Sequence, residues 1–335
     1  MQKTSEPVRI SVIGGGSWAT ALVKILSENN VKIQWWLKNA NDVHHIKEFG
    51  NNPRYLSNIQ INLKKVKVYT DLKKVLENTS VAILAVPAAF VEESLSVLKP
   101  ADLHDKILVS AVKGMIPGEN ILVTEFLEKK YLVSKHHLCA ITGPCHSEEI
   151  AMEKRSYLTI AGNDHVISSK VAELLNCRFV KTSVVEDLYG AEYCAVMKNI
   201  IAIACGMVRG LNYGDNFQAV LVSNAMQEIK RFLDVVHPKK RDLDASAYLG
   251  DLLVTAYSPY SRNRTLGYMV GKGYSVRSAQ VEMNMIAEGY YAVACVHNLN
   301  KKHQVSMPIT KMVYNVLYEK ITPYMEVKIL EESMS

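Results

Sequence analysis

The stretch Val8-Arg9-Ile10-Ser11-Val12-Ile13-Gly14-Gly15-Gly16-Ser17-Trp18-Ala19 is an apolar strand that leads directly into a Gly-x-Gly-x-x-Ala turn and then a helix. In such a turn Gly14 permits the tight bend, Gly16 lets the backbone approach a phosphate, and Ala19 lets the helix pack closely on the strand. N–H groups at the helix start then bind the negative pyrophosphate. The stretch therefore predicts a site for a nicotinamide or flavin dinucleotide.

A second apolar alternation, over residues 31–37, ends in Lys38 and Asn39. At this position an acidic residue holds the ribose 2′-hydroxyl of NAD, whereas a basic residue accepts the 2′-phosphate of NADP. Lys38 therefore favours NADPH. A solvated lysine at a strand end is the alternative, and Asp42 follows closely enough to serve a 2′-hydroxyl.

The bulk properties fit a two-domain protein of a reducing compartment. The chain has 335 residues, which is long for one hydrophobic core. Its six cysteines form no Cys-x-x-Cys pair and no zinc spacing, so we expect neither disulfides nor a metal site.

The polar start lacks a signal-peptide core, and no apolar run reaches the roughly twenty residues that span a bilayer. The net charge of +6 lies in scattered basic clusters, which argues against nucleic-acid binding. We expect a cytoplasmic protein without integral membrane contact.

The order of elements predicts the fold class. From residue 8 to about residue 182, short apolar runs alternate with helical stretches, which indicates a Rossmann-type, doubly wound α/β sheet that is mainly parallel. The later runs are candidates for antiparallel strands at one edge. Beyond residue 184, Ala, Met, Leu and Tyr recur at helical spacing. We therefore predict a dinucleotide-binding domain over residues 1–185 and an all-α substrate and catalytic domain over residues 186–335.

Three places in the chain carry charges that need an explanation. Lys113 precedes a glycine at the end of an expected strand, where ligands bind in doubly wound sheets. Lys198 interrupts an apolar helix, so its buried ammonium requires a carboxylate, for which Asp251 is the natural candidate. Arg262 and Arg264 lie in the first turn of an expected helix, where positive charge is unfavourable unless an anion binds there. The alternative for Lys113 is an ordinary Lys-Gly pair with no ligand. The alternative for Lys198 and Asp251 is a buried ion pair with a purely structural role.

Six blocks follow one another along the chain: Gly14-x-Gly16-x-x-Ala19, Val112-Lys113-Gly114, Gly143-Pro144, Lys198-Asn199, Gly250-Asp251-Leu252 and Ser261-Arg262-Asn263-Arg264. In these blocks and their order, the chain resembles the bacterial-type NAD(P)-dependent glycerol-3-phosphate dehydrogenases over about residues 8 to 310. The resemblance implies a hydroxyacid dehydrogenase-like architecture and the interconversion of dihydroxyacetone phosphate and sn-glycerol 3-phosphate with NADPH or NADH, which feeds glycerophospholipid synthesis.

The resemblance also implies a role for individual residues. Lys198 is then the general acid/base, with Asp251 beside it. The implied substrate residues are Lys113, Gly143, Cys145, Lys198, Asp251, Ser261, Arg262 and Asn263. The implied cofactor residues are Gly14, Gly16, Ser17, Trp18, Lys38, Lys113, Ser147, Arg262, Ile286 and Glu288. Cys145 and Ser147 stand where many relatives carry Ser or Thr and then Ala.

Two other functions are compatible with the sequence. A related hydroxyacid dehydrogenase that acts on another small ketone or ketoacid would share the catalytic lysine but would have no particular need for Arg262. A non-catalytic dinucleotide sensor would bind cofactor without turnover, although the presence of both Lys198 and Asp251 argues against it. For the assembly, we expect a homodimer formed through the helical domain.

Overall fold

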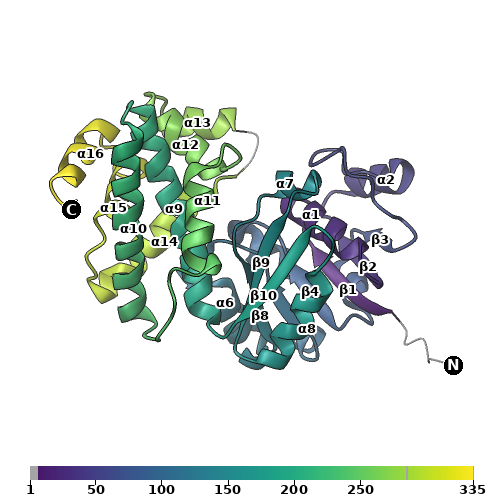
Figure 1. Cartoon of the computed structure of the whole chain (residues 1–335). Helices are drawn as coiled ribbons and strands as arrows, with labels where there is room; N and C mark the ends of the chain where they lie inside the picture. The colour runs from purple at the N-terminus through teal and green to yellow at the C-terminus, as the bar shows by residue number, and fades with distance from the viewer. Residues whose placement is uncertain (1–6, 284–285, 335) are drawn as a thin grey trace. The chain divides into compact units, whose positions relative to one another are not determined.

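The protein is described by a computed structural model that covers residues 7–283 and 286–334 and contains two compact units (Figure 1). Each unit is formed by three separate segments of the chain. The first unit comprises Met1–Val86, Phe90–Val112 and Thr124–Leu188, and the second comprises Pro87–Ala89, Lys113–Val123 and Tyr189–Ser335. The sequence analysis divides the chain once, between residues 185 and 186. It does not anticipate that two short segments from the N-terminal half belong to the helical unit.

The first unit is built on an eight-stranded sheet, which confirms the predicted doubly wound architecture. All neighbouring strands are parallel except β8 and β9, which are antiparallel, as expected for the later runs. In sheet order the strands are β10 (Val180–Val185), β9 (Ser156–Gly162), β8 (Leu138–Thr142), β5 (Ile107–Ser110), β4 (Val81–Leu84), β1 (Val8–Ile13), β2 (Val31–Trp36) and β3 (Val66–Tyr69).

Strand β1 is more deeply buried than the sequence pattern predicts. The alternation of Ile10 and Val12 indicates a strand with one buried face, but Ser11 and Ile13 are also buried. The reason is that β1 pairs with β2 on one side and with β4 on the other, and that helices cover both faces of the sheet. The Ser11 hydroxyl remains satisfied in this position because it donates to the Val75 carbonyl at 2.8 Å.

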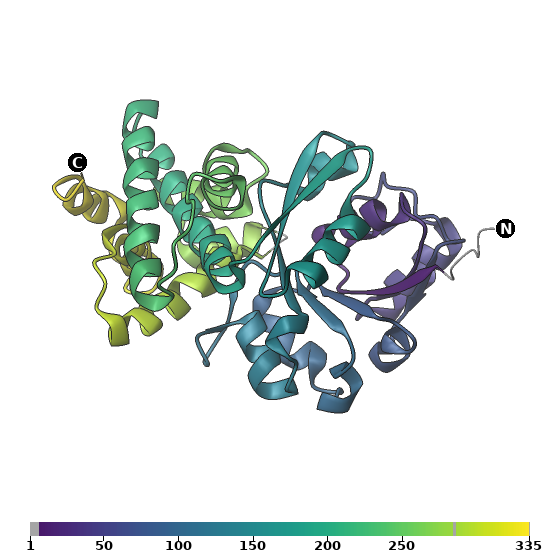
Figure 2. The same ribbon diagram turned by 60° about the horizontal axis from the view of Figure 1, so that its bottom comes forward.

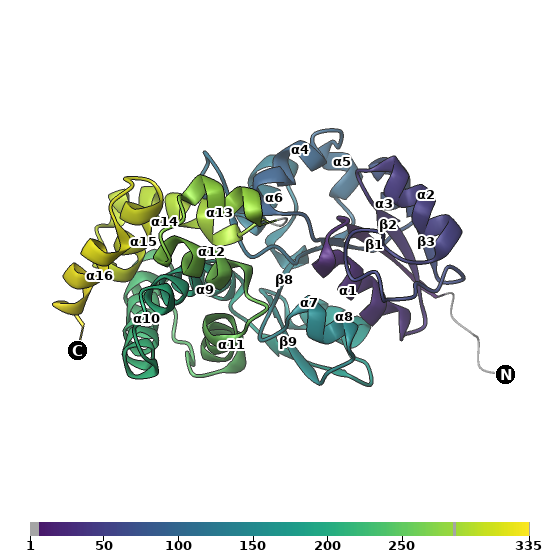
Figure 3. The ribbon, with the colours of Figure 1, turned by 90° about the horizontal axis from the view of Figure 1, so that it is seen from above.

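Helices lie on both faces of the sheet. Figure 3 shows α4, α5 and α6 on one side and α1, α7 and α8 on the other. The helices of this unit are α1 (Ser17–Ser27), α2 (Ala40–Phe49), α3 (Leu72–Leu76), α4 (Val91–Leu95), α5 (Pro100–Leu103), α6 (Val123–Tyr131), α7 (Ser147–Ala151) and α8 (His165–Leu175).

The second unit is mainly helical, with one short hairpin that the sequence analysis did not predict. The hairpin pairs β6 (Met115–Ile116) with β7 (Ile121–Leu122). In the helical part of the unit, the yellow C-terminal helices lie beside the green α10 (Figure 2). The helices are α9 (Leu188–Gly210), α10 (Asp215–Val236), α11 (Asp251–Tyr257), α12 (Arg262–Gly271), α13 (Val276–Glu282), α14 (Glu288–His303), α15 (Pro308–Leu317) and α16 (Pro323–Glu331), with a π-helical turn at Ser246–Gly250.

Helix α9 is the core of the helical unit. By length and composition it could cross a membrane, but its apolar window is completely buried within the structure. A helix that is apolar on all sides is expected at the centre of a packed bundle. Burial of α9 therefore explains its composition.

Helices α9 and α12 approach each other through glycines. A side chain at Gly267 would overlap the carbonyl oxygen of Ile203, and one at Gly271 would overlap that of Met207. Gly206 and Gly210 on α9 face the backbone of α12 in the same way. Only glycine allows this close contact of two helix backbones.

The glycine contact leads to a stability prediction. We expect Gly267→Ala to lower the free energy of unfolding by about 1–3 kcal/mol or more, because a backbone carbonyl cannot move aside without separating the helices. Urea unfolding followed by far-UV circular dichroism measures the change. Gly214→Ser is the matched control, since Gly214 precedes α10 and no atom of the residues that the structure describes lies within 4 Å of its Cβ position. Equal stability of the two variants would contradict the prediction.

Candidate active site

The glycine turn between β1 and α1 leaves room for a phosphate. Gly14 has a φ of +137°, and a side chain there would overlap the Ala85 carbonyl. Among the described residues, no atom lies within 4 Å of the Cβ position of Gly16; Gly16 is the N-cap of α1, which has no side-chain cap and no acidic residue in its first turn. An open backbone at an uncapped helix start is suited to bind the pyrophosphate of a dinucleotide.

Two polar side chains that the sequence analysis missed hold this turn in place. Trp35 Nε1 donates to the Gly14 carbonyl at 2.6 Å. Asn52 is fully buried, and its Nδ2 donates to the Gly15 carbonyl at 3.0 Å and to Thr20 Oγ1 at 2.8 Å. The turn is therefore fixed before any ligand binds. Both residues come from elsewhere in the chain, and no local motif marks them.

The end of β2 carries the side chain of Lys38 into solvent. Its ammonium pairs with Glu93 Oε1 at 2.6 Å, and the side chains are 71% and 62% exposed. Asn39 caps α2 by accepting from the backbone N–H groups of Asn41 and Asp42. Glu93 lies on α4, and the sequence analysis did not identify it as part of this region.

The segment that follows β8 contains three of the predicted site residues, Gly143, Cys145 and Ser147. Gly143 has a φ of +98°, and the Cys145 thiol donates to its carbonyl oxygen at 3.3 Å. Ser147 begins α7, and its hydroxyl donates to Glu148 Oε2 at 3.0 Å. The segment forms the expected junction of strand, turn and helix at the carboxyl end of β8.

In the helical unit, the predicted pairing of Lys198 with Asp251 is confirmed. The Lys198 ammonium donates directly to Asp251 Oδ1, and the two side chains are 6% and 1% exposed. Lys113 Nζ lies 3.5 Å from Asp251 Oδ2, so one carboxylate faces two ammonium groups. Asp251 is the first residue of α11, which continues directly from the π-helical turn Ser246–Gly250.

Lys113 reaches this cluster because its backbone is held against α9. Asn199 Nδ2 donates to the Lys113 carbonyl at 2.8 Å, and Asn199 is 5% exposed. The sequence analysis used the Lys198-Asn199 block only for its lysine. A second polar residue in an apolar helix was the signal that could have identified Asn199, because a buried amide also needs partners.

The start of α12 brings together the other predicted substrate residues. Ser261 caps the helix by accepting from the backbone N–H of Arg264 at 3.3 Å, and Arg262 is the first helical residue. Asn263 is 7% exposed, and its Oδ1 accepts from the backbone N–H of Gly289 at 2.8 Å. Asn263 thus also caps the start of α14, a structural role that the sequence did not indicate.

Glu288, at the start of α14, holds a segment of the N-terminal half. Its carboxylate accepts from the backbone N–H of Ala88 at 3.0 and 3.4 Å. Burial raises the pKa of Glu288 from its ordinary 4.5 to about 7, and the Ala88 N–H and the Arg262 charge oppose that rise. Ile286 lies just before this helix and is partly buried.

The raised pKa of Glu288 makes a pH-dependent stability prediction. The folded protein binds the Glu288 proton more tightly than the unfolded chain does, so its stabilising contribution is complete below about pH 4.5 and is lost as the pH rises through about 7. We expect the Tm of Glu288→Gln to fall less than that of the wild type between about pH 5 and 8. Glu282→Gln, at an exposed position near the end of α13, is the control. Parallel Tm curves for wild type and Glu288→Gln would contradict the prediction.

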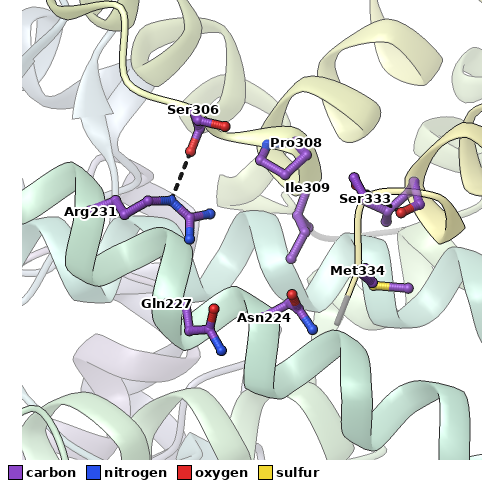
Figure 4. Close-up of a pocket in the computed structure, with 9 residues that line it drawn as sticks. Asn224, Gln227, Arg231, Ser306, Pro308, Ile309, Ser333 and Met334 are labelled. Carbon is purple, nitrogen blue, oxygen red and sulfur yellow. Dashed lines mark hydrogen bonds between the residues drawn. The ribbon is translucent and has the colours of Figure 1, made fainter.

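A pocket of about 370 Å³ lies elsewhere in the helical unit (Figure 4). Arg231 on α10 donates from Nε to the Ser306 carbonyl at 3.2 Å at its edge. Glu228, also on α10, is buried, and its carboxylate accepts from the backbone N–H groups of Ile309 and Thr310, so it caps α15. None of the predicted site residues lines this pocket.

Known proteins resemble the chain over both units. A family model described as the NAD-dependent glycerol-3-phosphate dehydrogenase N-terminus matches residues 9–167, and the corresponding C-terminus model matches residues 187–328. A glycerol-3-phosphate dehydrogenase [NAD(P)+] of an Exiguobacterium species is 33% identical over 95% of this chain and 94% of its own length. One from Clostridium botulinum is 32% identical over 94% of both. The crystal structure of glycerol-3-phosphate dehydrogenase from Coxiella burnetii matches with a TM-score of 0.91 and 30% identity, over 97% of this chain and 99% of that chain.

Proposed function

The chain belongs to the NAD-dependent glycerol-3-phosphate dehydrogenase family, and from that premise we propose that it interconverts dihydroxyacetone phosphate and sn-glycerol 3-phosphate with Lys198 as the acid/base residue. The protein is an NAD(P)-dependent oxidoreductase. The observation that carries the proposal for Lys198 is its buried ammonium, paired with Asp251 and accompanied by Lys113. Burying these charges is costly, and a proton-transfer role accounts for that cost.

The chemistry of the carbonyl group defines what Lys198 does. When bound, NADH or NADPH supplies the hydride that C2 of dihydroxyacetone phosphate receives. Oxygen on that carbon then gains negative charge, and the Lys198 ammonium donates the proton that neutralises it. Lys198 is left as a neutral amine and is protonated again from solvent. In the reverse direction the same amine removes the proton from the hydroxyl of sn-glycerol 3-phosphate.

Asp251 positions the two lysines. Its carboxylate faces the Lys198 ammonium through Oδ1 and the Lys113 ammonium through Oδ2, so neither lysine rotates freely. The Thr255 hydroxyl donates to the Asp251 main-chain carbonyl at 2.7 Å, within the first turns of α11. In our proposal Lys113 contacts both the substrate and the cofactor, while Asn199 fixes the backbone from which Lys113 projects.

The substrate phosphate is assigned to the start of α12. A helix N-terminus with an arginine at its first position supplies N–H donors, a favourable dipole and a guanidinium fork, all suited to a phosphate. Binding the phosphate would hold the reacting carbonyl in place for proton and hydride transfer. We assign the substrate contacts to Lys113, Gly143, Cys145, Ser261, Arg262 and Asn263.

The cofactor contacts are assigned in the same way. The open turn at Gly16 supports binding of the pyrophosphate there, and the end of β2 supports binding of the adenosine ribose near Lys38. We assign the cofactor contacts to Gly14, Gly16, Ser17, Trp18, Lys38, Lys113, Ser147, Arg262, Ile286 and Glu288.

A substrate comparison tests this function against related chemistries. We expect kcat/KM for dihydroxyacetone phosphate to exceed that for unphosphorylated dihydroxyacetone by about 10²-fold or more, because phosphate binding energy is used to orient the carbonyl. A small 2-ketoacid is the second comparison substrate. Preferred turnover of the ketoacid would indicate another hydroxyacid dehydrogenase, and cofactor binding without any turnover would indicate a dinucleotide sensor.

The cellular setting follows from the reaction. Its product, sn-glycerol 3-phosphate, is the backbone precursor of glycerophospholipids, and the substrate is a small phosphorylated molecule. We propose that the protein acts in the cytoplasm, as a homodimer formed through the helical domain. The six free cysteines of the chain are consistent with a reducing compartment.

A further inference from the structure

The end of strand β2 pairs a cation with a carboxylate where an adenosine ribose is expected to bind. Lys38 follows β2, and Glu93 comes from helix α4, which follows β4. We propose that Glu93 is a specificity-determining residue: by binding the Lys38 ammonium, it lowers the affinity for NADPH, which carries a 2′-phosphate, relative to NADH. This inference rests on the proposed dinucleotide site, and it concerns a residue that the proposed function does not use.

The first step concerns the place of Lys38. The Gly14 N–H donates to the Trp36 carbonyl at 3.1 Å, so the end of β2 lies directly beside the glycine turn. In doubly wound folds the residue at the end of the second strand meets the 2′ position of the ribose. A lysine there attracts a 2′-phosphate as a point charge.

The second step concerns the place of Glu93. Strand β1 pairs in parallel with both β2 and β4, so the carboxyl ends of these three strands lie at the same end of the sheet. The segment that follows β4 therefore starts at the same end of the sheet as the glycine turn and Lys38. Glu93 Oε1 lies 2.6 Å from Lys38 Nζ, and both side chains are well exposed. Exposed ion pairs of this kind contribute little to folding stability. The pair is thus accessible to a ligand and is not needed to hold the fold together.

The third step concerns the neighbouring charges. Arg54 Nε pairs with Asp42 Oδ1 at 3.0 Å, and Asp42 lies in the first turn of α2, which begins just after Lys38. Lys38 and Arg54 thus each have a carboxylate partner. A 2′-phosphate brings up to two negative charges and must compete with Glu93 for the Lys38 ammonium, whereas a 2′-hydroxyl brings none. Glu93 therefore penalises NADPH and leaves NADH nearly unaffected.

The test measures binding of two probes that differ only in the 2′-phosphate: adenosine 2′,5′-bisphosphate and 5′-AMP. We expect Glu93→Gln to bind the bisphosphate on the order of ten-fold more tightly at low ionic strength, with little change for 5′-AMP. The gain should shrink as salt is added. With full cofactors, the ratio of kcat/KM for NADPH to that for NADH should rise by a similar factor.

A neighbouring residue supplies a matched control. Glu92, on the same helix, pairs with Lys130 at 2.5 Å, so Glu92→Gln removes the same charge without releasing Lys38. We expect this variant to leave the discrimination between the probes unchanged, and Lys38→Gln to remove most of the gain when added to Glu93→Gln. Equal effects of Glu92→Gln and Glu93→Gln, or equal changes for both probes, would overturn the proposal. Because the probes lack nicotinamide and do not react, the result is independent of whether the chain reduces dihydroxyacetone phosphate.

Discussion

Replacement of Lys198 by Met is expected to lower kcat by about 10²- to 10⁴-fold, because the variant has no group to protonate the carbonyl oxygen as it is reduced. The side chains have similar length, so the variant mainly removes the charge and the proton. Asp251 keeps one ammonium partner, since Lys113 Nζ lies 3.5 Å from its other oxygen. Initial rates at saturating dihydroxyacetone phosphate and cofactor measure the change, and circular dichroism and Tm show whether the variant is folded.

A second substitution at this position separates the proton from the charge. Lys198→Arg keeps a positive charge beside Asp251, but a guanidinium does not give up its proton at accessible pH. We expect Lys198→Arg to be stable and still impaired in kcat. Near-normal turnover by folded Lys198→Met would exclude Lys198 as the acid.

Replacement of Arg262 by Ala is expected to raise KM for dihydroxyacetone phosphate by about 10- to 100-fold, with a smaller effect on kcat. A charged hydrogen-bonding group contributes about 1.5–3 kcal/mol, and the loss falls on the phosphate, which does not react. Steady-state kinetics with varied substrate at saturating cofactor measure both constants. A fall in kcat with unchanged KM would contradict the assignment.

Arg264→Ala is the control for this substitution. Arg264 lies on the same turn of α12 and carries the same charge, and its backbone N–H donates to the Ser261 cap in either variant. We expect a smaller effect on KM than for Arg262→Ala. The comparison separates a specific phosphate contact from the general positive potential of the helix start.

The predictable parts of the structure were those with a local physical cause. The glycine turn followed from the backbone conformation that it requires, and the eight strands followed from apolar runs of strand length. The pairing of Lys198 with Asp251 followed because an isolated charge in an apolar helix must find a partner. The glycine turn and the strands each needed only a short window of sequence. The ion pair needed two windows, each with a single charged residue among apolar ones.

The remaining features depend on contacts between distant segments. Glu288 binds the backbone of Ala88, two hundred residues away, and Asn199 binds the backbone of Lys113. Backbone groups have no sequence signature, so neither contact is visible in composition or spacing. The contact of Glu93 with Lys38 is likewise not visible in the sequence, because nothing near Glu93 in the chain indicates that the fold places it beside Lys38. The burial of Ser11 is a further example, because the position of β1 between β2 and β4 determines it.

The most direct measurement is the initial rate at which the purified chain oxidises NADPH and NADH with dihydroxyacetone phosphate, followed by the loss of reduced-nicotinamide absorbance. We predict rapid oxidation that depends on dihydroxyacetone phosphate and yields sn-glycerol 3-phosphate. No oxidation of either cofactor, by protein shown to bind them, would contradict the proposed reaction.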